Sequence, residues 1–399
     1  MHDVKDVLAA ATFRTEDIEL VLDRSRPSWV RFDPVLGYVP DNMDVQDGSD
    51  GRWCTYRFAP AGERRVINGA GLPCRINTYG DSYTFCQQVS DGETWQEYLA
   101  AHIGEPVRNF GSGGYGVYQA YRRARRMEAT EGFSGDFLIL GIYDDDHIRS
   151  LDSVRWVRRQ WRRRHQKGPT TAPLHGLPWA HLRYDLDAGG FTEVPGICDS
   201  DDDLRALCDA DRFYQALKDD QVVRIFTIRT GGRVDDIDDL QALADVFGVK
   251  VDLAGKDLEQ RAEDARQLHL AYGLAGTEYV LDKMRAWCAE VGKGLLIVLF
   301  YADSEIHKFI NNDWRFDPGF VDYLGRSGLP TVDLLRKHAE DYRSYNVSTL
   351  EYVSRLCVGN KGAKHFGHYS PAGNFWTAMH LVGPFIDHLD PKPAPYRDA

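Results

Sequence analysis

The stretch RINTYGDS at residues 75–82 decides the fold, because a short apolar strand ends there in a turn of small polar residues. The segments that follow alternate in type. ETWQEYLAAHIG (93–104) and VYQAYRRARRMEATEG (117–132) have the spacing of helices, whereas PVRNFG (106–111) and DFLILGIY (136–143) have the pattern of strands. Regular alternation of strand and helix predicts parallel βαβ units.

The alternation breaks after Tyr143 and resumes nearer the C-terminal end. KGLLIVLFYAD (293–303) and LPTVDLL (329–335) have the pattern of strands, and a last helix begins near Pro371. We therefore expect a three-layer, flavodoxin-like α/β fold with a mostly parallel sheet and a helical insertion that caps its crevice. The expected divisions are an N-terminal extension packed on the core (1–70), the first part of the core (71–150), the mainly helical insertion (151–290) and the second part of the core (291–399).

The composition is that of an ordinary globular protein. With 399 residues, 43% of them hydrophobic, the chain can bury one large core or two smaller ones. A net charge of −12 argues against nucleic acid as a partner. No run approaches the roughly 20 apolar residues of a membrane span, so a membrane is not expected as a partner either. Seven scattered cysteines without CxxC spacing and the absence of a signal-peptide pattern predict free thiols and a cytoplasmic location. No cofactor is expected, and the oligomeric state is left open.

The Gly80-Asp81-Ser82 turn is the first candidate for chemistry. It follows the first strand, and open α/β sheets bind their ligands at the carboxyl ends of such strands. Gly80 permits a sharp turn that would direct the hydroxyl of Ser82 into the crevice. A lone GDS tripeptide also occurs by chance or for structural reasons.

The second block is NFGSGGYGVYQ at 109–119, directly after the second strand. Glycines at a strand end let backbone N–H groups approach a ligand, as an oxyanion hole requires. Gly111, Gly113 and Gly116 also satisfy the GxGxxG dinucleotide fingerprint, but this is the second strand and no acidic ribose contact stands out. A purely structural glycine turn is a third reading.

Two further blocks lie at later strand ends. GIYDDDH (141–147) follows the third strand, and HFGHYSPAGN (365–374) precedes the last helix, where Pro371 suits the first turn. His368 is therefore a candidate base. His365 and His368 could also join Asp144–Asp146 around a metal ion, but an HxxH sequence on a loop lacks the helical spacing that aims both rings at one ion, so no metal site is expected.

The four ordered blocks resemble those of SGNH/GDSL hydrolases, over about residues 75–145 and 362–385. The resemblance implies the SGNH hydrolase fold, with Ser82 as nucleophile and oxyanion donor, Gly114 as a second backbone donor and His368 as general acid and base. Ser82 Oγ should then lie within hydrogen-bond reach of His368, at about 2.6–3.2 Å or somewhat farther when no ligand is bound. The other residues expected around the substrate are Asp81, Asn109, Tyr143, Asp145 and His365.

Two positions depart from that family. Asp144 stands where an asparagine would donate to the oxyanion, and His365 stands where an aspartate would orient the base. An ionised Asp144 would repel the oxyanion, so it must be protonated, turned away or replaced as a donor. His365 cannot anchor His368 as a carboxylate would, so a backbone carbonyl or one of Asp144, Asp145 and Asp146 orients His368 instead. If the alignment slips by one residue, the hydroxyl of Tyr143 becomes the donor.

The expected function is hydrolysis of an O-acyl (acetyl) ester on a carbohydrate or another small molecule. Four tryptophans could stack on a sugar: Trp95, Trp156, Trp161 and Trp314. The alternatives are an acyltransferase, a repurposed SGNH enzyme acting on a glycosidic or phosphate-linked group, and a catalytically silent glycan-binding module. The basic stretch VRWVRRQWRRRHQK (154–167) is either an anion- or sugar-binding face or a solvated helix face that pairs with acidic runs.

Overall fold

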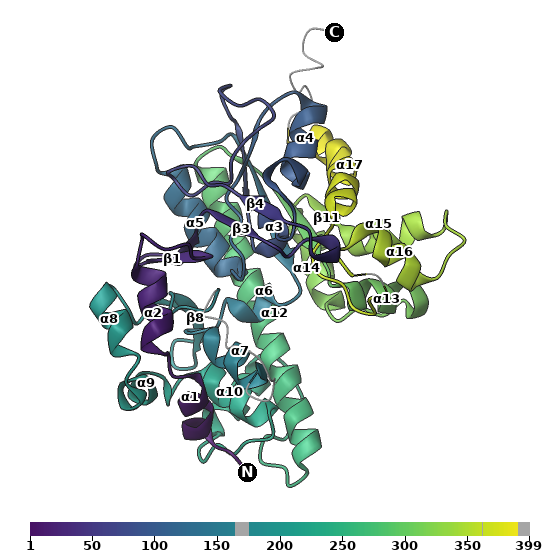
Figure 1. Cartoon of the computed structure of the whole chain (residues 1–399). Coiled ribbons are helices and arrows are strands. Elements are labelled where there is room, and N and C mark those ends of the chain that lie inside the picture. Colours follow the sequence, from purple (N-terminus) through teal and green to yellow (C-terminus); the bar gives the residue numbers. More distant parts are fainter. Residues whose placement is uncertain (164–174, 361, 390–399) are drawn as a thin grey trace. The chain divides into compact units, whose positions relative to one another are not determined.

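The computed structural model describes residues 1–163, 175–360 and 362–389 (Figure 1). Its contacts divide the chain into two compact units. Unit 1 comprises Met1–Val39 and His147–Tyr279, and unit 2 comprises Pro40–Asp146 and the chain from Val280 onward. Each unit has its own buried core.

Unit 2 is built on a sheet of five parallel strands in the order β11-β10-β7-β5-β6. Numbered along the chain, this order is 2-1-3-4-5, the order of flavodoxin-like doubly wound sheets. The prediction of an α/β fold with a parallel sheet is therefore confirmed. The strands are β5 (Ile76–Tyr79), β6 (Val107–Asn109), β7 (Phe137–Tyr143), β10 (Gly294–Phe300) and β11 (Thr331–Asp333).

The central strands β7 and β10 consist of continuous apolar runs, which explains their position in the middle of the sheet. In β7 and β10 almost every side chain is buried, as parallel strands covered on both faces require. The two strands pair in register from Phe137 with Gly294 to Tyr143 with Phe300.

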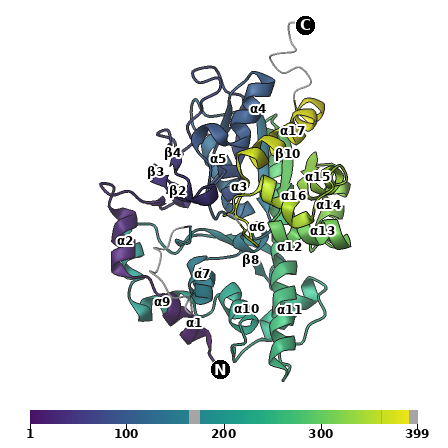
Figure 2. The same cartoon turned by 45° about the vertical axis from the view of Figure 1, so that its right-hand side comes forward.

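Helices cover both faces of this sheet (Figures 1 and 2). From β5 the chain crosses to β6 on one side, and from β6 it crosses back to β7 on the other. Right-handed crossovers therefore place α4 (Trp95–Ile103) and α5 (Val117–Glu128) on opposite faces. The last helix, α17 (Pro371–His388), packs against α4. The other elements of unit 2 are β3 (Met43–Val45), η1 (Ser49–Gly51), β4 (Cys54–Tyr56), α3 (Ser82–Phe85), η2 (Asp91–Glu93), α13 (Asp303–Asn312), α14 (Pro318–Ser327), α15 (Leu334–Tyr342) and α16 (Thr349–Leu356).

Unit 1 is mainly helical and also contains an antiparallel hairpin, β8–β9, that the sequence patterns did not predict. Its elements are α1 (Val4–Ala11), α2 (Thr15–Leu22), β1 (Val30–Asp33), β2 (Gly37–Pro40), α6 (Asp146–Arg149), α7 (Trp156–Arg163), β8 (His181–Asp185), β9 (Gly190–Val194), α8 (Asp201–Ala206), α9 (Ala210–Leu217), α10 (Gln221–Arg229) and α11 (Asp238–Val246). The long helix α12 (Leu258–Glu290) contributes residues to both units.

The N-terminal segment departs from the expected division. Residues 1–70 were expected to form one extension on the core, but Met1–Val39 belong to unit 1 and only the part from Pro40 belongs to unit 2. The reason is apolar burial, since the ring of Phe13 packs edge-on against Phe213 at 5.5 Å and stacks on Trp156 at 6.5 Å.

The basic stretch is not a solvated face over its described part. Arg158 is buried and pairs with buried Asp152 at 2.6 Å, and the indoles of Trp156 and Trp161 are buried as well. The remainder of the stretch, from residue 164, lies outside the described residues.

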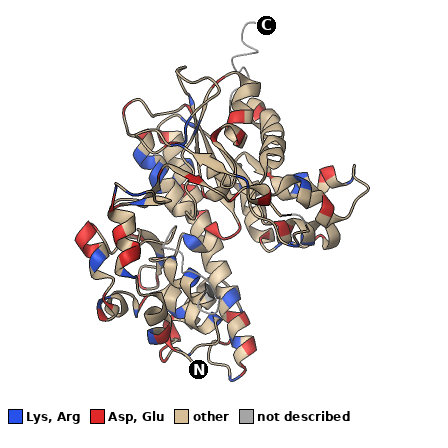
Figure 3. Ribbon diagram, viewed as in Figure 1, with Lys and Arg blue, Asp and Glu red and all other residues tan. Residues whose placement is uncertain are grey.

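Charges of both signs are interspersed along α12, where Glu263 pairs with Arg266 and Asp282 with Arg285 (Figure 3). Within the described ranges, no helix has the length and apolar character needed to cross a membrane.

Candidate active site

The candidate site lies at the carboxyl edge of the parallel sheet in unit 2. Strand order reverses between β5 and β7, and such reversals open the crevice in which doubly wound sheets bind ligands. Ser82 follows β5 and Asp144 follows β7. The two blocks therefore meet at this switch point.

The turn that carries Ser82 is tightly built. Gly80 has a φ of +153°, and a Cβ there would lie 2.7 Å from the carbonyl oxygen of Gly141. Asp81 caps the short helix α3, because its Oδ1 accepts from the backbone N–H of Tyr83 at 2.8 Å. The hydroxyl of Ser82 donates to the other oxygen, Asp81 Oδ2, at 3.1 Å. Asp81 thus holds both the helix start and the hydroxyl.

Tyr83 brings the blocks together. Its buried ring stacks on Tyr143 at 4.6 Å and lies 5.0 Å from the imidazole of His368 and 5.6 Å from Phe300. These contacts join the ends of three neighbouring strands and the C-terminal block next to Ser82. Burial raises the pKa of the Tyr83 hydroxyl well above its ordinary value, so this residue stays neutral.

The glycine loop after β6 packs against the same turn. Asn109 Oδ1 accepts from the N–H of Gly111 at 2.9 Å, and Ser112 donates its N–H to the carbonyl of Gly80 at 3.0 Å. A Cβ at Gly111 would lie 2.2 Å from Phe85 N, so that glycine is explained by the close approach of α3. Asn109 therefore shapes the loop.

Two backbone donors are available for an oxyanion. Gly114 has a left-handed φ of +87° and is buried. Among the hydrogen bonds of the described residues, none occupies the N–H of Ser82 or of Gly114. These are the two donors that the family resemblance implies.

His368 is held by its backbone and by one side chain. Its carbonyl accepts from Val358 N at 2.7 Å. Gln88 Oε1 lies 2.8 Å from the backbone nitrogen and 2.9 Å from Nδ1 of the imidazole. The next residue, Tyr369, is anchored by His338 Nε2 at 2.7 Å. The imidazole is therefore fixed on its Nδ1 side.

The expected hydrogen bond between Ser82 and His368 is not formed in this structure. Among the described residues, the Ser82 hydroxyl bonds to Asp81, because that acceptor lies on the adjacent residue of the same turn. His365 is exposed and makes no hydrogen bond or ion pair with the described part of the chain. His365 therefore does not orient His368.

Asp144 is enclosed by groups other than His368. Its Oδ2 accepts from Ala302 N at 3.0 Å, and its buried Oδ1 has no hydrogen-bond partner among the described residues. The hypothesis that Asp144 orients His368 is therefore wrong in this conformation. Burial raises the pKa of Asp144 well above its ordinary value, and the carboxylates of Glu305 and Asp317 raise it further against the effect of the Ala302 N–H.

The remaining acidic and aromatic residues of this block have structural contacts. Asp146 is buried, and its Oδ2 accepts from the N–H of Tyr143 at 2.9 Å. Asp145 is half-buried. Among residues 1–163, 175–360 and 362–389, no group of three His, Cys, Asp or Glu side chains is arranged to hold a metal ion.

Three of the four tryptophans expected to stack on a sugar are core residues. Trp95, Trp156 and Trp161 are at most 6% exposed, whereas Trp314 is 46% exposed with Lys308 Nζ 4.7 Å above its ring. Core packing explains the first three, because a large aromatic side chain is stabilised most by full burial.

Comparison with known proteins leaves the family open. The sequence matches no protein-family model and no curated protein. Among solved structures, the chain is similar to an acetyl xylan esterase from the rumen bacterium Butyrivibrio proteoclasticus, with 11% identity and a TM-score of 0.30 over 85% of this chain. It spans 66% of the length of that structure. We therefore take the function from the geometry of the site.

Proposed function

We propose that this chain is a serine esterase of the SGNH type that hydrolyses O-acyl esters. The observation that carries the proposal is the position of Tyr83, whose ring joins the Ser82 turn to the His368 block and to the end of β7. This packing supports the proposal, because acyl transfer requires a nucleophile, a base and oxyanion donors at one site.

The proposed chemistry has two steps. Rotation about χ1 turns the Ser82 hydroxyl from Asp81 toward the ester, and Oγ attacks the carbonyl carbon while His368 Nε2 accepts the proton. The N–H groups of Ser82 and Gly114 stabilise the oxyanion. His368 then protonates the leaving alcohol, which departs and leaves an acyl-serine. In the second step His368 takes a proton from water, whose oxygen attacks the acyl carbon; the bond to Oγ then breaks, His368 returns the proton to Oγ, and the acid leaves.

An acetyl ester on a carbohydrate is the proposed substrate class. Trp314 is the exposed tryptophan of the four considered, so the proposal gives it the role of stacking on the sugar ring. Comparing hydrolysis of acetylated xylo-oligosaccharides with hydrolysis of a simple aryl acetate tests this choice. Replacing Trp314 with alanine should weaken only the first reaction.

Hydrolysis of p-nitrophenyl acetate tests the proposed reaction. The wild type should release nitrophenol, and Ser82→Ala should lower kcat by roughly 10⁴-fold or more, because the nucleophile of such a site is indispensable. Ser344→Ala changes an exposed serine of the same unit and should have no effect. Equal activity in wild type and Ser82→Ala would refute the proposal.

A further inference from the structure

The contact between Gln88 and His368 joins two residues that lie 280 positions apart in the sequence. We propose that Gln88 is the positioning residue of the base and takes the place of the carboxylate that SGNH hydrolases carry three residues before their histidine. This inference rests on the proposed function, since it concerns the base of the same site. Gln88 holds His368 in the tautomer with its proton on Nδ1.

The orientation of the Gln88 amide follows from its other partners. Gln88 Nε2 lies 2.9 Å from the carbonyl oxygen of Asp47, which can only accept, and Oε1 lies 2.8 Å from the backbone N–H of His368, which can only donate. The oxygen therefore faces His368. Because an amide oxygen only accepts, the 2.9 Å contact with Nδ1 requires a proton on that nitrogen. Neutral His368 then carries its lone pair on Nε2, the nitrogen that a serine nucleophile needs.

The backbone holds Gln88 in an unusual conformation. Its φ is +75°, a left-handed value that non-glycine residues rarely adopt. Its N–H donates to the hydroxyl of Tyr56 at 2.8 Å, and that hydroxyl donates to Asp47 Oδ1 at 3.1 Å. On the other side, a Cβ at Gly367 would lie 2.1 Å from Gln88 Oε1. The left-handed backbone at Gln88 and the missing side chain at Gly367 together allow the amide to approach His368 closely.

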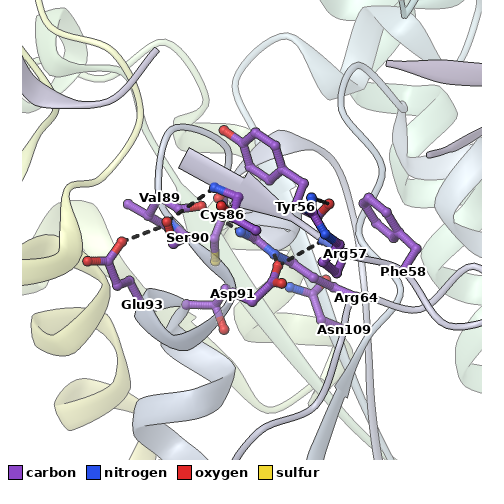
Figure 4. A network of polar contacts seen from close by, with 12 residues as sticks. Tyr56, Arg57, Phe58, Arg64, Cys86, Val89, Ser90, Asp91, Glu93 and Asn109 are labelled. Carbon is purple, nitrogen blue, oxygen red and sulfur yellow. Dashed lines mark hydrogen bonds and ion pairs between the residues drawn. The ribbon is translucent and has the colours of Figure 1, made fainter. Parts of the chain in front are cut away.

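A buried arginine, Arg64, fixes the turn that carries Gln88. Figure 4 shows Arg64 beside Asp91 and Cys86. The guanidinium of Arg64 pairs with Asp91 at 3.0 Å and is 2% exposed. Its other donors go to the carbonyls of Phe85 at 2.7 Å, Cys86 at 2.8 Å and Val89 at 2.5 Å. Each carbonyl belongs to the turn around residue 88, so the turn has little freedom to move.

A neutral amide and a carboxylate act differently on the same imidazole. Both accept from Nδ1–H and select the same tautomer, but only a carboxylate stabilises the imidazolium by charge. In a triad protease, an orienting group that selects the wrong tautomer lowers kcat about 10⁴-fold. Because the oxygen of the Gln88 amide faces Nδ1, Gln88 selects the tautomer that leaves Nε2 free to accept a proton, and kcat is not lowered in this way.

The tautomer of His368 can be observed directly. In full-length protein with ¹⁵N-labelled histidine, two-bond correlation spectra distinguish Nδ1–H from Nε2–H, and a His368→Ala variant assigns the signals. The wild type should show Nδ1–H. Gln88→Met, which keeps the unbranched shape without the amide, should lose that preference and lower kcat on p-nitrophenyl acetate by roughly 100-fold or more. Gln87→Met makes the same change at a half-buried neighbour and should match the wild type.

The variant Gln88→Glu distinguishes two roles of Gln88: orienting the imidazole of His368, and linking His368 to the carbonyl of Asp47. Glutamate keeps an acceptor for Nδ1–H but cannot donate to the Asp47 carbonyl, so it should preserve the tautomer and keep kcat within about tenfold of wild type. If Gln88→Glu is as impaired as Gln88→Met in both readouts, the bridge to Asp47 is what matters and the proposal is overturned. An Nε2–H tautomer in the wild type, or an unchanged tautomer in Gln88→Met, also overturns it.

The two proposals fail in different ways. If Ser82→Ala leaves hydrolysis intact, the serine mechanism is wrong, yet an Nδ1–H tautomer that depends on Gln88 still supports the positioning role. If Gln88→Met does not fold, the wild-type tautomer and the Gln88→Glu variant decide the question.

Discussion

At the residue scale, the two departures from the SGNH pattern have different consequences. Gln88 Oε1 lies 2.9 Å from Nδ1 of His368, and in our proposal this contact has the orienting role that the resemblance assigns to position 365. Asp144, which the resemblance to SGNH hydrolases aligns with an asparagine, lies in a buried setting that favours its neutral form. A neutral carboxylic acid can donate a hydrogen bond, as the amide would.

Replacing Asp144 with asparagine should therefore be tolerated. The amide oxygen can accept from Ala302 N, as Oδ2 does now, and the amide nitrogen supplies a donor in place of the unpartnered Oδ1. Asp144→Asn should preserve or raise the hydrolysis of p-nitrophenyl acetate and extend it to higher pH. A loss of several orders of magnitude would show instead that Asp144 is needed as a carboxylate.

The stability of the same variant should depend on pH. Because the folded-state pKa of Asp144 is raised, its contribution is complete at low pH and is lost as the pH rises through that pKa. Asparagine does not titrate, so Asp144→Asn should gain stability relative to the wild type as the pH rises. Denaturant unfolding across the pH range measures this, with Asp322→Asn, an exposed carboxylate, as control. A pH-independent difference would contradict the account.

Sequence patterns identified the catalytic candidates but not the residues that hold them in place. Ser82 and His368 lie in short motifs at strand ends, which parallel topology brings to one edge. Gln88 carries no local signal, since its partner is 280 residues away and its turn requires a left-handed backbone. Tyr83 follows Ser82 directly, but only the folded sheet shows which rings surround it.

At the element scale, the sheet was predictable and much of the periphery was not. Buried parallel strands such as β7 and β10 are continuous apolar runs, so they stand out from their surroundings. The hairpin β8–β9 has no such run, and most of its side chains are half-buried or exposed. Its pairing is determined by tertiary packing, which sequence periodicity does not record.

The turn after α3 should depend on Arg64. Arg64→Met leaves Asp91 as an uncompensated buried charge and removes the donors to the turn, so it should destabilise the protein by about 3–5 kcal/mol. Arg65→Met alters an exposed neighbour and should change stability by less than about 0.5 kcal/mol. Denaturant unfolding measures both. Similar values for the two variants would mean that Arg64 does not hold the turn.

At the scale of the whole molecule, the chain comprises two units that interleave in sequence. The first 39 residues join the long insertion, so the insertion is not an isolated excursion from the sheet unit. The amphipathic helices α1 and α2 explain this, because each buries an apolar face and the insertion supplies the helices against which these faces pack.

Truncating Phe13 should loosen unit 1 selectively. The ring is 3% exposed, and Phe13→Ala should cost about 3–5 kcal/mol of local stability through the cavity it leaves. Hydrogen exchange followed by mass spectrometry should speed up in peptides from 1–39, 147–163 and 175–279 but not in β5, β7 and β10. Val35→Ala, at an exposed position of the same segment, is the control. Equal acceleration in both units would indicate a single cooperative core.

Covalent labelling by a fluorophosphonate tests the central claim most directly, because the reagent requires an activated serine and needs no knowledge of the substrate. The account predicts an adduct on the peptide that contains Ser82, no adduct there in Ser82→Ala, and much slower labelling in His368→Ala. Absence of labelling in the wild type, an adduct on another serine, or an unchanged rate in His368→Ala would contradict a Ser82–His368 hydrolase.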